Sequence, residues 1–343
     1  MERSGDRSGQ GDAKVTLKEV AEAAGVSRSA VSRTFTEGAS VSPRTRKKVE
    51  KAARDLGYRP NFLARSLTTK RTALIGLLSN NFQNPAFMEV FDLFTAGLQE
   101  RGLRPLLVNQ SDLDQAEASL EMLMQYSVDG LIVASSTLPP QFSKVLAETR
   151  LPVVHAFGKP AAPFKVNVVG VDNVHGGELA AELLIERNHR SVAFLGGPRK
   201  ATSTEDRLAG FERRLGLAGI GIAQTRFAET YSYAAGRKEM AALLDQGPVE
   251  AVFCGDDILC MGARDICRER GVTVPEEIGL IGFNDIAMAD WTAYELTTIR
   301  QPIRDIIISA VELVVRLVEE PGRSAEARLF PCQAVVRKTL RSL

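Results

Sequence analysis

A group of side chains able to hydrogen-bond to DNA bases lies near the start of the chain. It consists of Arg28, Ser29, Ser32 and Arg33. Residues at this spacing share one face of an α-helix. An arginine can donate two hydrogen bonds to one guanine, and a serine can bond several bases or a phosphate. The pattern predicts a surface that reads nucleic acid; the alternative is a structural helical module whose arginines are only solvated.

Helix signals around this group predict three short helices. The first has a Thr-x-x-Glu capping box that begins at Thr16 and satisfies two backbone amides. A glycine turn follows, and Ser27 can cap the second helix, which carries the arginines. Pro43 and Gly57 mark the start and the end of the third. Two short helices around a turn, braced by a third, are typical of a helix-turn-helix, whose second helix enters the major groove.

The charge of the chain is distributed unevenly. Residues 14–71 hold 14 Lys and Arg against 5 Asp and Glu, whereas residues 72–343 hold 27 against 34. A small basic module joined to a mildly acidic larger one indicates a binder of polyanions with a separate second task.

The segments TLKEVAEAAGVSRSAVSR and VSPRTRKKVEKAARDLGYRPNFLARSL resemble the DNA-binding headpiece of the lactose/galactose-repressor (LacI/GalR) family of bacterial transcription regulators. The resemblance implies a homodimer on double-stranded operator DNA. It implies that Arg28, Ser29 and Arg33 read bases. It also implies that four polar residues hold phosphates or the headpiece register, namely Thr16, Ser27, Ser32 and Asn61. One departure is Ala30, where the family often has threonine, and it leaves the operator sequence open.

The stretch Pro60–Leu67 corresponds to the hinge helix of that family. A helix of about seven residues does not persist alone in water, because nucleation costs more than so few hydrogen bonds return. We therefore expect it to order only when DNA and a partner subunit hold it. Ala64 and Leu67 would then lie in the minor groove, where the leucine kinks the duplex. The alternative is a flexible linker whose leucines pack on the next domain.

The rest of the chain alternates between two kinds of segment. Apolar runs such as 73–78, 130–134 and 251–254 are separated by amphipathic stretches such as 206–217 and 258–270. Alternation of strands and helices predicts parallel sheets covered by helices on both faces. The number of units predicts an α/β domain of two doubly wound lobes, with a ligand held between them at the carboxyl ends of the strands.

The family resemblance continues to about Arg341, and the fold it implies is similar to that of the periplasmic sugar-binding proteins. The motifs that carry it are IGLLSNNFQNPAF, VDNVHGGELAAELLIE, FLGGP followed by DRLAGF, GDDILCMGA, GLIGFND and LTTIRQP. By this resemblance, the side chains that face a small-molecule effector are Asn81, Phe82, Asn84, Phe87, Ser203, Arg207, Tyr231, Asp256 and Asn284.

The chemistry of these residues suits a sugar or sugar derivative. Asn and Asp side chains bond hydroxyls, Arg207 can bond a pair of oxygens, and Phe82 or Tyr231 can stack on a ring. Three departures from the family pattern leave the effector open, with a purine or another metabolite as the alternative. Asp256 stands where Asn is frequent, Asn284 where Asp is frequent, and Ala86 where an aromatic residue is frequent.

Each polar position also has a structural interpretation. Asn84-Pro85 is compatible with ordinary turn chemistry, and Asn284-Asp285 with a capped loop. Arg207 could form an ion pair with Glu205 instead of binding ligand.

These patterns predict a domain order. We expect a disordered tail at 1–13, the helix-turn-helix at 14–59, the hinge at 60–71 and the effector and dimerisation domain at 72–343. The two lobes are expected at 72–170 plus 298–329 and at 171–297 plus 330–343. No leucine heptads follow at the end of the chain, which favours a dimer over a tetramer.

Other classes of protein fit the sequence less well. The three histidines have no metal-ligand spacing, and no nucleophile elbow or phosphate loop is present, so neither an enzyme nor a bound metal or cofactor is expected. The four cysteines form no CxxC pair and are expected to be reduced core thiols. A periplasmic receptor would need a signal peptide, and a non-specific nucleoid protein would bind unrelated duplexes equally. The most apolar stretch, 306–318, is interrupted by Glu312 and Arg316, so we expect a cytoplasmic protein without a membrane span.

Overall fold

The computed structural model describes residues 15–36, 38–59, 71–80, 82–110, 116–135, 146, 148–149, 151–160 and 166–343. The chain divides into two compact units, Met1–Thr72 and Ala73–Leu343. Four of the predicted site residues, Asn61, Ala64, Leu67 and Asn81, lie outside the described residues, as do the predicted tail and most of the predicted hinge.

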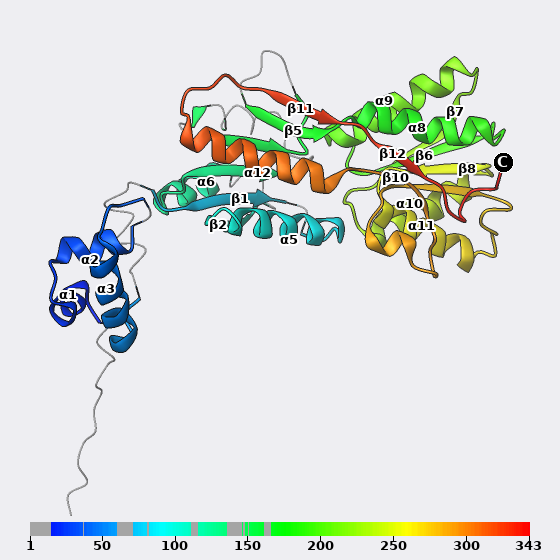
Figure 1. Cartoon of the computed structure of the whole chain (residues 1–343). Helices are drawn as coiled ribbons and strands as arrows, with labels where there is room; N and C mark the ends of the chain where they lie inside the picture. The colour runs from blue at the N-terminus through cyan, green and yellow to red at the C-terminus, as the bar shows by residue number, and fades with distance from the viewer. Residues whose placement is uncertain are drawn as a thin grey trace, which may run out of the picture. The chain divides into compact units, whose positions relative to one another are not determined.

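The N-terminal unit contains the predicted helix-turn-helix. Its helices are α1 (Leu17–Ala24), α2 (Arg28–Thr34) and α3 (Pro43–Leu56) (Figure 1). Both bonds of the capping box at Thr16 are present, and Ser27 caps α2. Gly25 ends α1 with a φ of 63°, a left-handed conformation that favours glycine.

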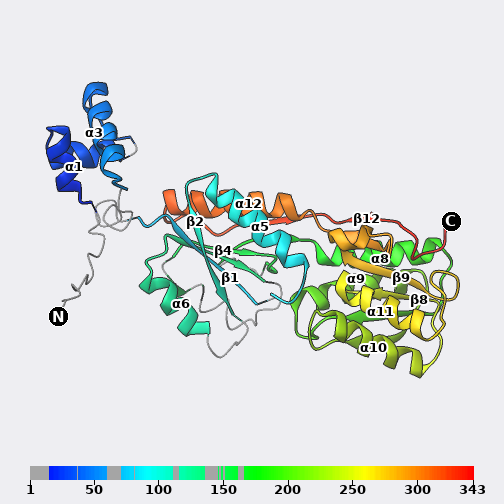
Figure 2. The same cartoon turned by 90° about the horizontal axis from the view of Figure 1, so that it is seen from below.

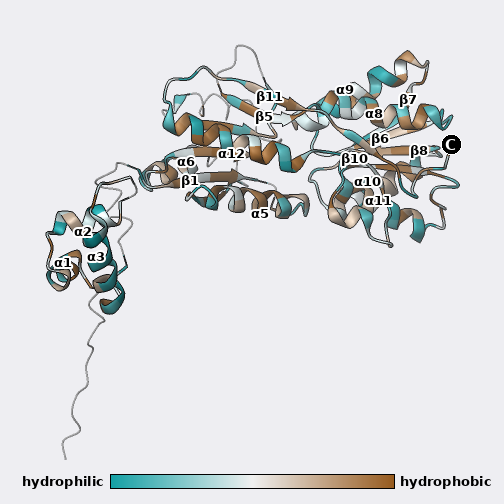
Figure 3. Cartoon of the chain, viewed as in Figure 1, coloured by the Kyte–Doolittle hydropathy of each residue, from teal (hydrophilic) through white to brown (hydrophobic). Residues whose placement is uncertain are grey.

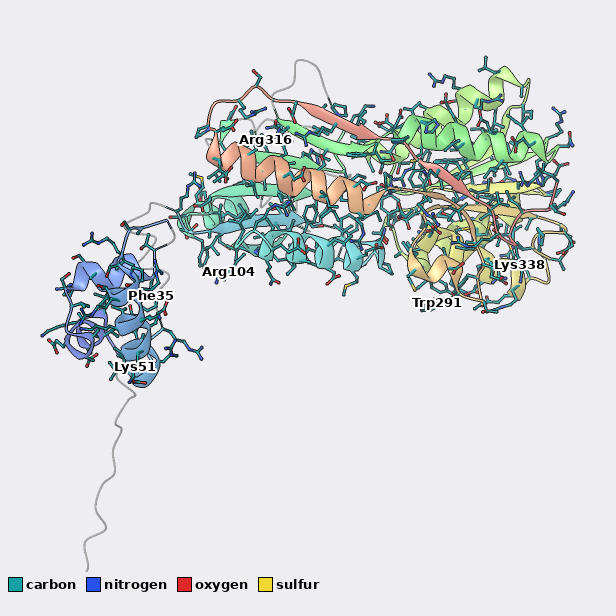
Figure 4. The ribbon with its side chains drawn as sticks, viewed as in Figure 1. Phe35, Lys51, Arg104, Trp291, Arg316 and Lys338 are labelled. Atoms are coloured by element: carbon teal, nitrogen blue, oxygen red, sulfur yellow. The ribbon has the colours of Figure 1, made fainter. Side chains whose placement is uncertain are left out.

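The core of this unit is small and made of short side chains. Val20, Val31 and Val49, one from each helix, are fully buried and are surrounded by alanines. The alanines let the helices approach closely. The rings of Phe35 and Tyr58 lie 5.9 Å apart beside this core. Phe35, labelled in Figure 4, directly follows the last residue of α2.

The first lobe of the C-terminal unit is built on a six-stranded parallel sheet in the order β11-β5-β4-β3-β1-β2. Its strands are β1 (Leu74–Ser79), β2 (Arg104–Asn109), β3 (Gly130–Ala134), β4 (Val153–Ala156), β5 (Asn167–Val171) and β11 (Ala327–Phe330). Its helices are α5 (Ala86–Gln99), α6 (Ala116–Gln125) and α12 (Ile303–Glu319).

Helices cover both faces of this sheet. Helices α5 and α12 lie on one face and α6 on the other (Figure 2). Successive strand residues point to opposite faces. Ile132 therefore joins the core under α5 and α12, while Leu131 and Val133 join the core under α6. Figure 3 shows the apolar residues concentrated on the strands and on the inward faces of the helices.

The second lobe is built on another six-stranded sheet, in the order β12-β10-β9-β8-β6-β7. Its strands are β6 (Val192–Gly196), β7 (Ile222–Phe227), β8 (Ala251–Cys254), β9 (Gly279–Asn284), β10 (Thr297–Arg300) and β12 (Gln333–Val335). Its helices are α8 (Asn173–Glu186), α9 (Thr202–Leu217), α10 (Tyr233–Gln246) and α11 (Asp257–Glu269), followed by the 3-10 turn η2 (Ala287–Asp290). The sheet is parallel except for β12, which is antiparallel to β10.

The helices of this lobe pack in pairs, α8 with α9 on one face and α10 with α11 on the other (Figure 1). Glycine makes the approach of α8 and α9 possible. A Cβ atom on Gly210 would lie 1.9 Å from the carbonyl oxygen of Val174.

The chain passes between the lobes after β5, after β10 and after β11. The predicted lobe boundaries need a small correction. Val171 belongs to the first sheet, residues 298–300 belong to β10 of the second sheet, and Phe330 belongs to the first sheet. A lobe boundary falls where the hydrogen bonds between a strand and its sheet end. The sequence does not mark that residue. No helix among the described residues is long and apolar enough to cross a membrane.

Candidate functional site

The first candidate site is the outer face of α2. Arg28, Ser29, Ser32 and Arg33 are exposed there, while Val31 faces the core. Ser27 accepts a hydrogen bond from the amide of Ala30 at 3.2 Å, so its side chain sets the start of the helix. In the part of the chain that the structure describes, neither arginine takes part in an ion pair. The face therefore carries two positive charges that no described residue neutralises.

Thr16 has a structural role of its own. Its hydroxyl donates to Glu19 at 2.9 Å, and its backbone amide donates to the same carboxylate at 2.6 Å. These bonds lower the pKa of Glu19. The side chain of Thr16 remains exposed at the start of α1, so capping leaves its predicted phosphate contact sterically open.

One residue of this unit was not predicted as part of the site. Arg46 of α3 donates through Nη1 to the carbonyl oxygen of Thr34 at 2.9 Å, which ties α3 to the last residue of α2. The sequence did not predict this contact. Arg46 bonds a backbone atom of another helix, and no pattern of side chains marks such a partner. Lys51, further along α3, projects outward (Figure 4).

The second candidate site is a cavity inside the C-terminal unit, between the two lobes. Its volume is about 40 Å³, room for a few water molecules. The lining residues are Asn84, Ala86, Phe87, Val90, Phe157, Val171, Asn173, Arg207, Tyr231, Asp256, Asn284, Gln301 and Ile303. They come from both lobes and from the segment between β10 and α12, at the carboxyl ends of the strands.

The structure brings six predicted effector residues together around this cavity: Asn84, Phe87, Arg207, Tyr231, Asp256 and Asn284. Two others lie away from it. Phe82 is 37% exposed and packs on Phe91 with the ring centroids 4.9 Å apart. Ser203 lies behind Tyr231, whose hydroxyl group it meets at 3.0 Å. Ser203 therefore positions the tyrosine, and it is not among the residues that line the cavity.

Arg207 is buried and held by two neutral partners. Its Nε donates to Asn173 Oδ1 at 2.8 Å, and its Nη1 donates to the carbonyl oxygen of Gly255 at 2.5 Å. Its guanidinium carbon lies 3.5 Å from the centre of the Phe283 ring. Burial lowers the pKa of Arg207, but a guanidinium stays charged in proteins. Among the described residues, its Nη2 has no hydrogen-bond partner, so a donor remains at the cavity.

Two expectations about Arg207 need correction. Its observed partner is Asn173, and no ion pair with Glu205 is formed among the described residues. Helix α9 begins at Thr202, four residues before the predicted amphipathic stretch 206–217, so Arg207 lies in its second turn. The guanidinium reaches the cavity because its side chain extends back along the helix.

Asp256 is the carboxylate of the site and caps α11. Its Oδ1 accepts from the amide of Ile258 at 2.9 Å. Its Oδ2 accepts from Asn84 Nδ2 at 2.8 Å and from Asn284 Nδ2 at 2.9 Å. Burial raises the pKa of Asp256, and these hydrogen bonds and the charge of Arg207 oppose that shift. All three of its hydrogen-bond partners are donors, so the carboxylate is held as an acceptor.

A second carboxylate lies behind the cavity. Asp257 accepts from the hydroxyl of Thr298 at 2.6 Å and from the amide of Ile286 at 2.9 Å. Burial raises the pKa of Asp257 to about 7, and repulsion from Asp256 adds to the effect. These contacts join α11 to β10 and to the loop after β9, so Asp257 sets the position of its neighbour in the cavity.

The structural interpretations of Asn84 as a turn residue and of Asn284 as part of a capped loop agree in part with the structure. Asn84 Oδ1 accepts from the amide of Ala86 at 3.0 Å, as turn chemistry predicts, yet its Nδ2 reaches Asp256. Asn284 has a φ of 119°, and Asp285 is bound by Arg300 and Arg337. Both asparagines shape the local backbone and line the cavity.

Sequence reasoning missed two polar residues of the cavity, Asn173 and Gln301. Each follows the end of a strand, β5 and β10 respectively, and that placement was the available signal. All four cysteines are buried and unpaired. No group of His, Cys, Asp or Glu among the described residues is arranged to hold a metal ion.

Comparison with known proteins agrees with this architecture. The family model for bacterial regulatory proteins of the lacI family matches residues 16–61, and the periplasmic binding protein-like domain matches residues 181–340. The transcriptional regulator DegA of Bacillus subtilis is 30% identical over 331 residues, which cover 94% of this chain and 97% of DegA.

Two solved structures are similar to this chain over nearly its full length. The Lac repressor dimer bound to operator and the anti-inducer ONPF superposes with a TM-score of 0.87 at 27% identity, covering 96% of this chain and all of that one. The transcriptional regulator CelR in complex with cellobiose superposes with a TM-score of 0.72 at 28% identity, covering 95% of this chain and all of that one.

A helix-turn-helix unit joined to a two-lobed domain with a polar cavity defines a DNA-binding transcription regulator with an effector-binding domain. The chain belongs to the LacI family of bacterial transcription regulators. The relatives named above are transcription regulators.

Proposed function

We propose that this protein is a cytoplasmic repressor that binds a palindromic or near-palindromic operator as a homodimer. A sugar or sugar derivative bound between the two lobes controls that binding. The observation that carries the proposal is the cavity at Arg207, where a buried guanidinium, three asparagines and a carboxylate converge.

On the DNA side, Arg28, Ser29 and Arg33 contact bases in the major groove. Their exposure on one face of α2 supports this assignment. The residues assigned to phosphates or to the headpiece register are Thr16, Ser27, Ser32 and Asn61, and those assigned to the minor groove are Ala64 and Leu67. A symmetric dimer presents two such helices, and its operator is therefore an inverted repeat. The Lac repressor, which has the same fold, was solved as a dimer on its operator.

On the effector side, the polar groups of the cavity suit hydroxyls. A hydroxyl both donates and accepts, so one sugar can bond the Asp256 carboxylate and the Arg207 guanidinium. Phe87 and Phe157 supply apolar surface for the faces of a sugar ring. CelR, a regulator of the same fold, was solved with cellobiose. The effector assignment that the family resemblance implies also includes Asn81, Phe82 and Ser203.

Selection of DNA from a random pool tests both halves of the proposal. The full-length chain is used alone and with a panel of mono- and disaccharides. We expect an inverted repeat to be enriched, and we expect one sugar to change the amount of DNA retained. Enrichment of sequences without two-fold symmetry would contradict the dimer. Retention that no sugar changes, together with unchanged melting of the protein in their presence, would contradict a sugar effector.

A further inference from the structure

The two lobes are joined across the cavity by a bond between Asn84 and Asp256. Asn84 precedes α5 in the first lobe, and Asp256 caps α11 in the second. Their 2.8 Å hydrogen bond is buried, with 4% and 3% of the two residues exposed. A second contact lies at the rim, where Lys159 meets Asp206 at 2.5 Å, but about half of the lysine side chain is exposed. Solvent and salt weaken such a rim pair, so the buried bond is the stronger link.

The carboxylate fixes the direction of the two side-chain amides bonded to it. An ionised carboxylate only accepts, so Asn84 and Asn284 both present their NH2 groups to Asp256. Asn284 must then present its oxygen to Gln301, which donates to it through Nε2. This leaves Gln301 Oε1 buried, without a partner among the described residues, and at the cavity. The site therefore holds two acceptors. Asp256 already accepts a hydrogen bond from Asn84, whereas Gln301 Oε1 has no donor among the described residues.

A sugar does not fit in this arrangement. The cavity of about 40 Å³ compares with roughly 300 Å³ or more for ordinary ligand sites. Entry of a sugar requires the lobes to separate, and separation breaks the bond from Asn84 to Asp256. A buried carboxylate that loses a donor is destabilised unless another donor replaces it. The ligand must therefore present an O–H or N–H group to Asp256, and a second donor would satisfy Gln301 Oε1.

We propose that Asn84 is an internal competitor of the effector. Its carboxamide occupies the donor position at Asp256, holds the lobes together when no effector is bound, and is exchanged for a ligand hydroxyl when the effector enters. This inference rests on the proposed function, in which the effector binds between the lobes. It reverses the usual expectation for a residue that lines a binding cavity, because removal of Asn84 strengthens effector binding.

The test variant is Asn84→Ser. A serine oxygen can still accept the amide of Ala86 but is too short to reach Asp256, so the turn is kept and the bridge is lost. Two controls are matched to it. Asn284→Ser removes an amide from the same carboxylate, together with its bond to Gln301, but leaves the bond from Asn84 in place. Lys159→Met removes only the rim pair.

Separation of the lobes is measured without any ligand. Spin labels are placed on Glu319→Cys at the end of α12 and on Leu217→Cys at the end of α9, both exposed and in different lobes. The native cysteines are buried and do not compete for label. Dilution with unlabelled chain restricts the signal to distances within one protomer. Binding is measured by calorimetry with D-glucose, D-galactose, D-ribose and cellobiose as probes.

We expect Asn84→Ser to lengthen the distance between the labels, while both controls keep the distance of the unmodified chain. We also expect a probe sugar to bind Asn84→Ser about tenfold more tightly, because the closed population no longer competes with it. An unchanged label distance, or weaker sugar binding by Asn84→Ser, would overturn the inference and leave Asn84 an ordinary contact. If no probe binds either chain, the sugar effector is wrong, and the label distances alone decide whether Asn84 closes the lobes.

Discussion

Arg207 and Asn173 form a buried pair in which the guanidinium Nε donates to the amide oxygen at 2.8 Å. They lie on neighbouring helices, α9 and α8, and both line the cavity between the lobes. The bond orients the guanidinium, because it fixes Nε while Nη2 has no hydrogen-bond partner among the described residues. Asn173 thus acts on the site through Arg207.

This pairing predicts the effect of Arg207→Ala. The variant should lose about 1.5–3 kcal/mol of effector binding, the scale of a hydrogen bond to a charged group. Its affinity for operator without effector should be nearly unchanged, because the N-terminal unit is untouched. Calorimetry with the sugar found by DNA selection measures the first quantity, and DNA titration measures the second. Unaltered sugar affinity in a folded variant would make Arg207 purely structural.

Arg28→Ala should weaken operator binding by about 1–3 kcal/mol and relax the preference at one base pair in each half-site. Arg28 is exposed on α2 and has no ion-pair partner among the described residues, so the change should leave the fold intact. Competition binding with single-base operator variants measures the preference. Equal weakening for every sequence would show that Arg28 contacts phosphate.

Gly210→Ala should destabilise the C-terminal unit by about 1–3 kcal/mol or more, because overpacking against backbone forces α8 and α9 apart. The added Cβ would lie 1.9 Å from the Val174 carbonyl oxygen. A Cβ added at Gly216, on the same helix, would meet no atom within 4 Å, so this position provides a matched control. Gly216→Ala should be neutral or stabilising by about 0.5–1 kcal/mol. Equal urea midpoints for the two variants would refute the argument.

Stability should depend on pH through Asp257. Its pKa is raised to about 7 by burial, whereas an unfolded aspartate titrates near 4. The folded chain therefore holds the proton more tightly, and its stability falls as pH rises from about 4 to about 7. Asp257→Asn should remove this loss, because an amide can accept from Ile286 and donate to Thr298. Urea unfolding at several pH values compares the two chains, and parallel curves would show that Asp257 does not titrate in this range.

The sequence by itself determined the local structure. The capping box at Thr16, the cap at Ser27 and the turn at Gly25 depend on residues at most a few positions apart, so the N-terminal helices could be predicted from side-chain types alone. The alternation of apolar runs and amphipathic stretches determined the two α/β lobes for a similar reason, because the periods of strand and helix are local properties. Resemblance to the family added the residues around the cavity.

Only the tertiary structure decided which of those residues meet. Asn84 and Asp256 are separated by 172 positions, and their contact depends on how two separate sheets face each other. The cavity is lined by Asn173 and Gln301, which were not predicted, and not by Phe82 and Ser203, which were. The orientation of a side chain near a strand end depends on its packing against distant elements. The antiparallel direction of β12 was also decided by the tertiary structure, because this edge strand pairs with β10, which is distant in the sequence. Hydrogen bonds across the cavity have no local pattern, and a single sequence therefore does not contain their signal.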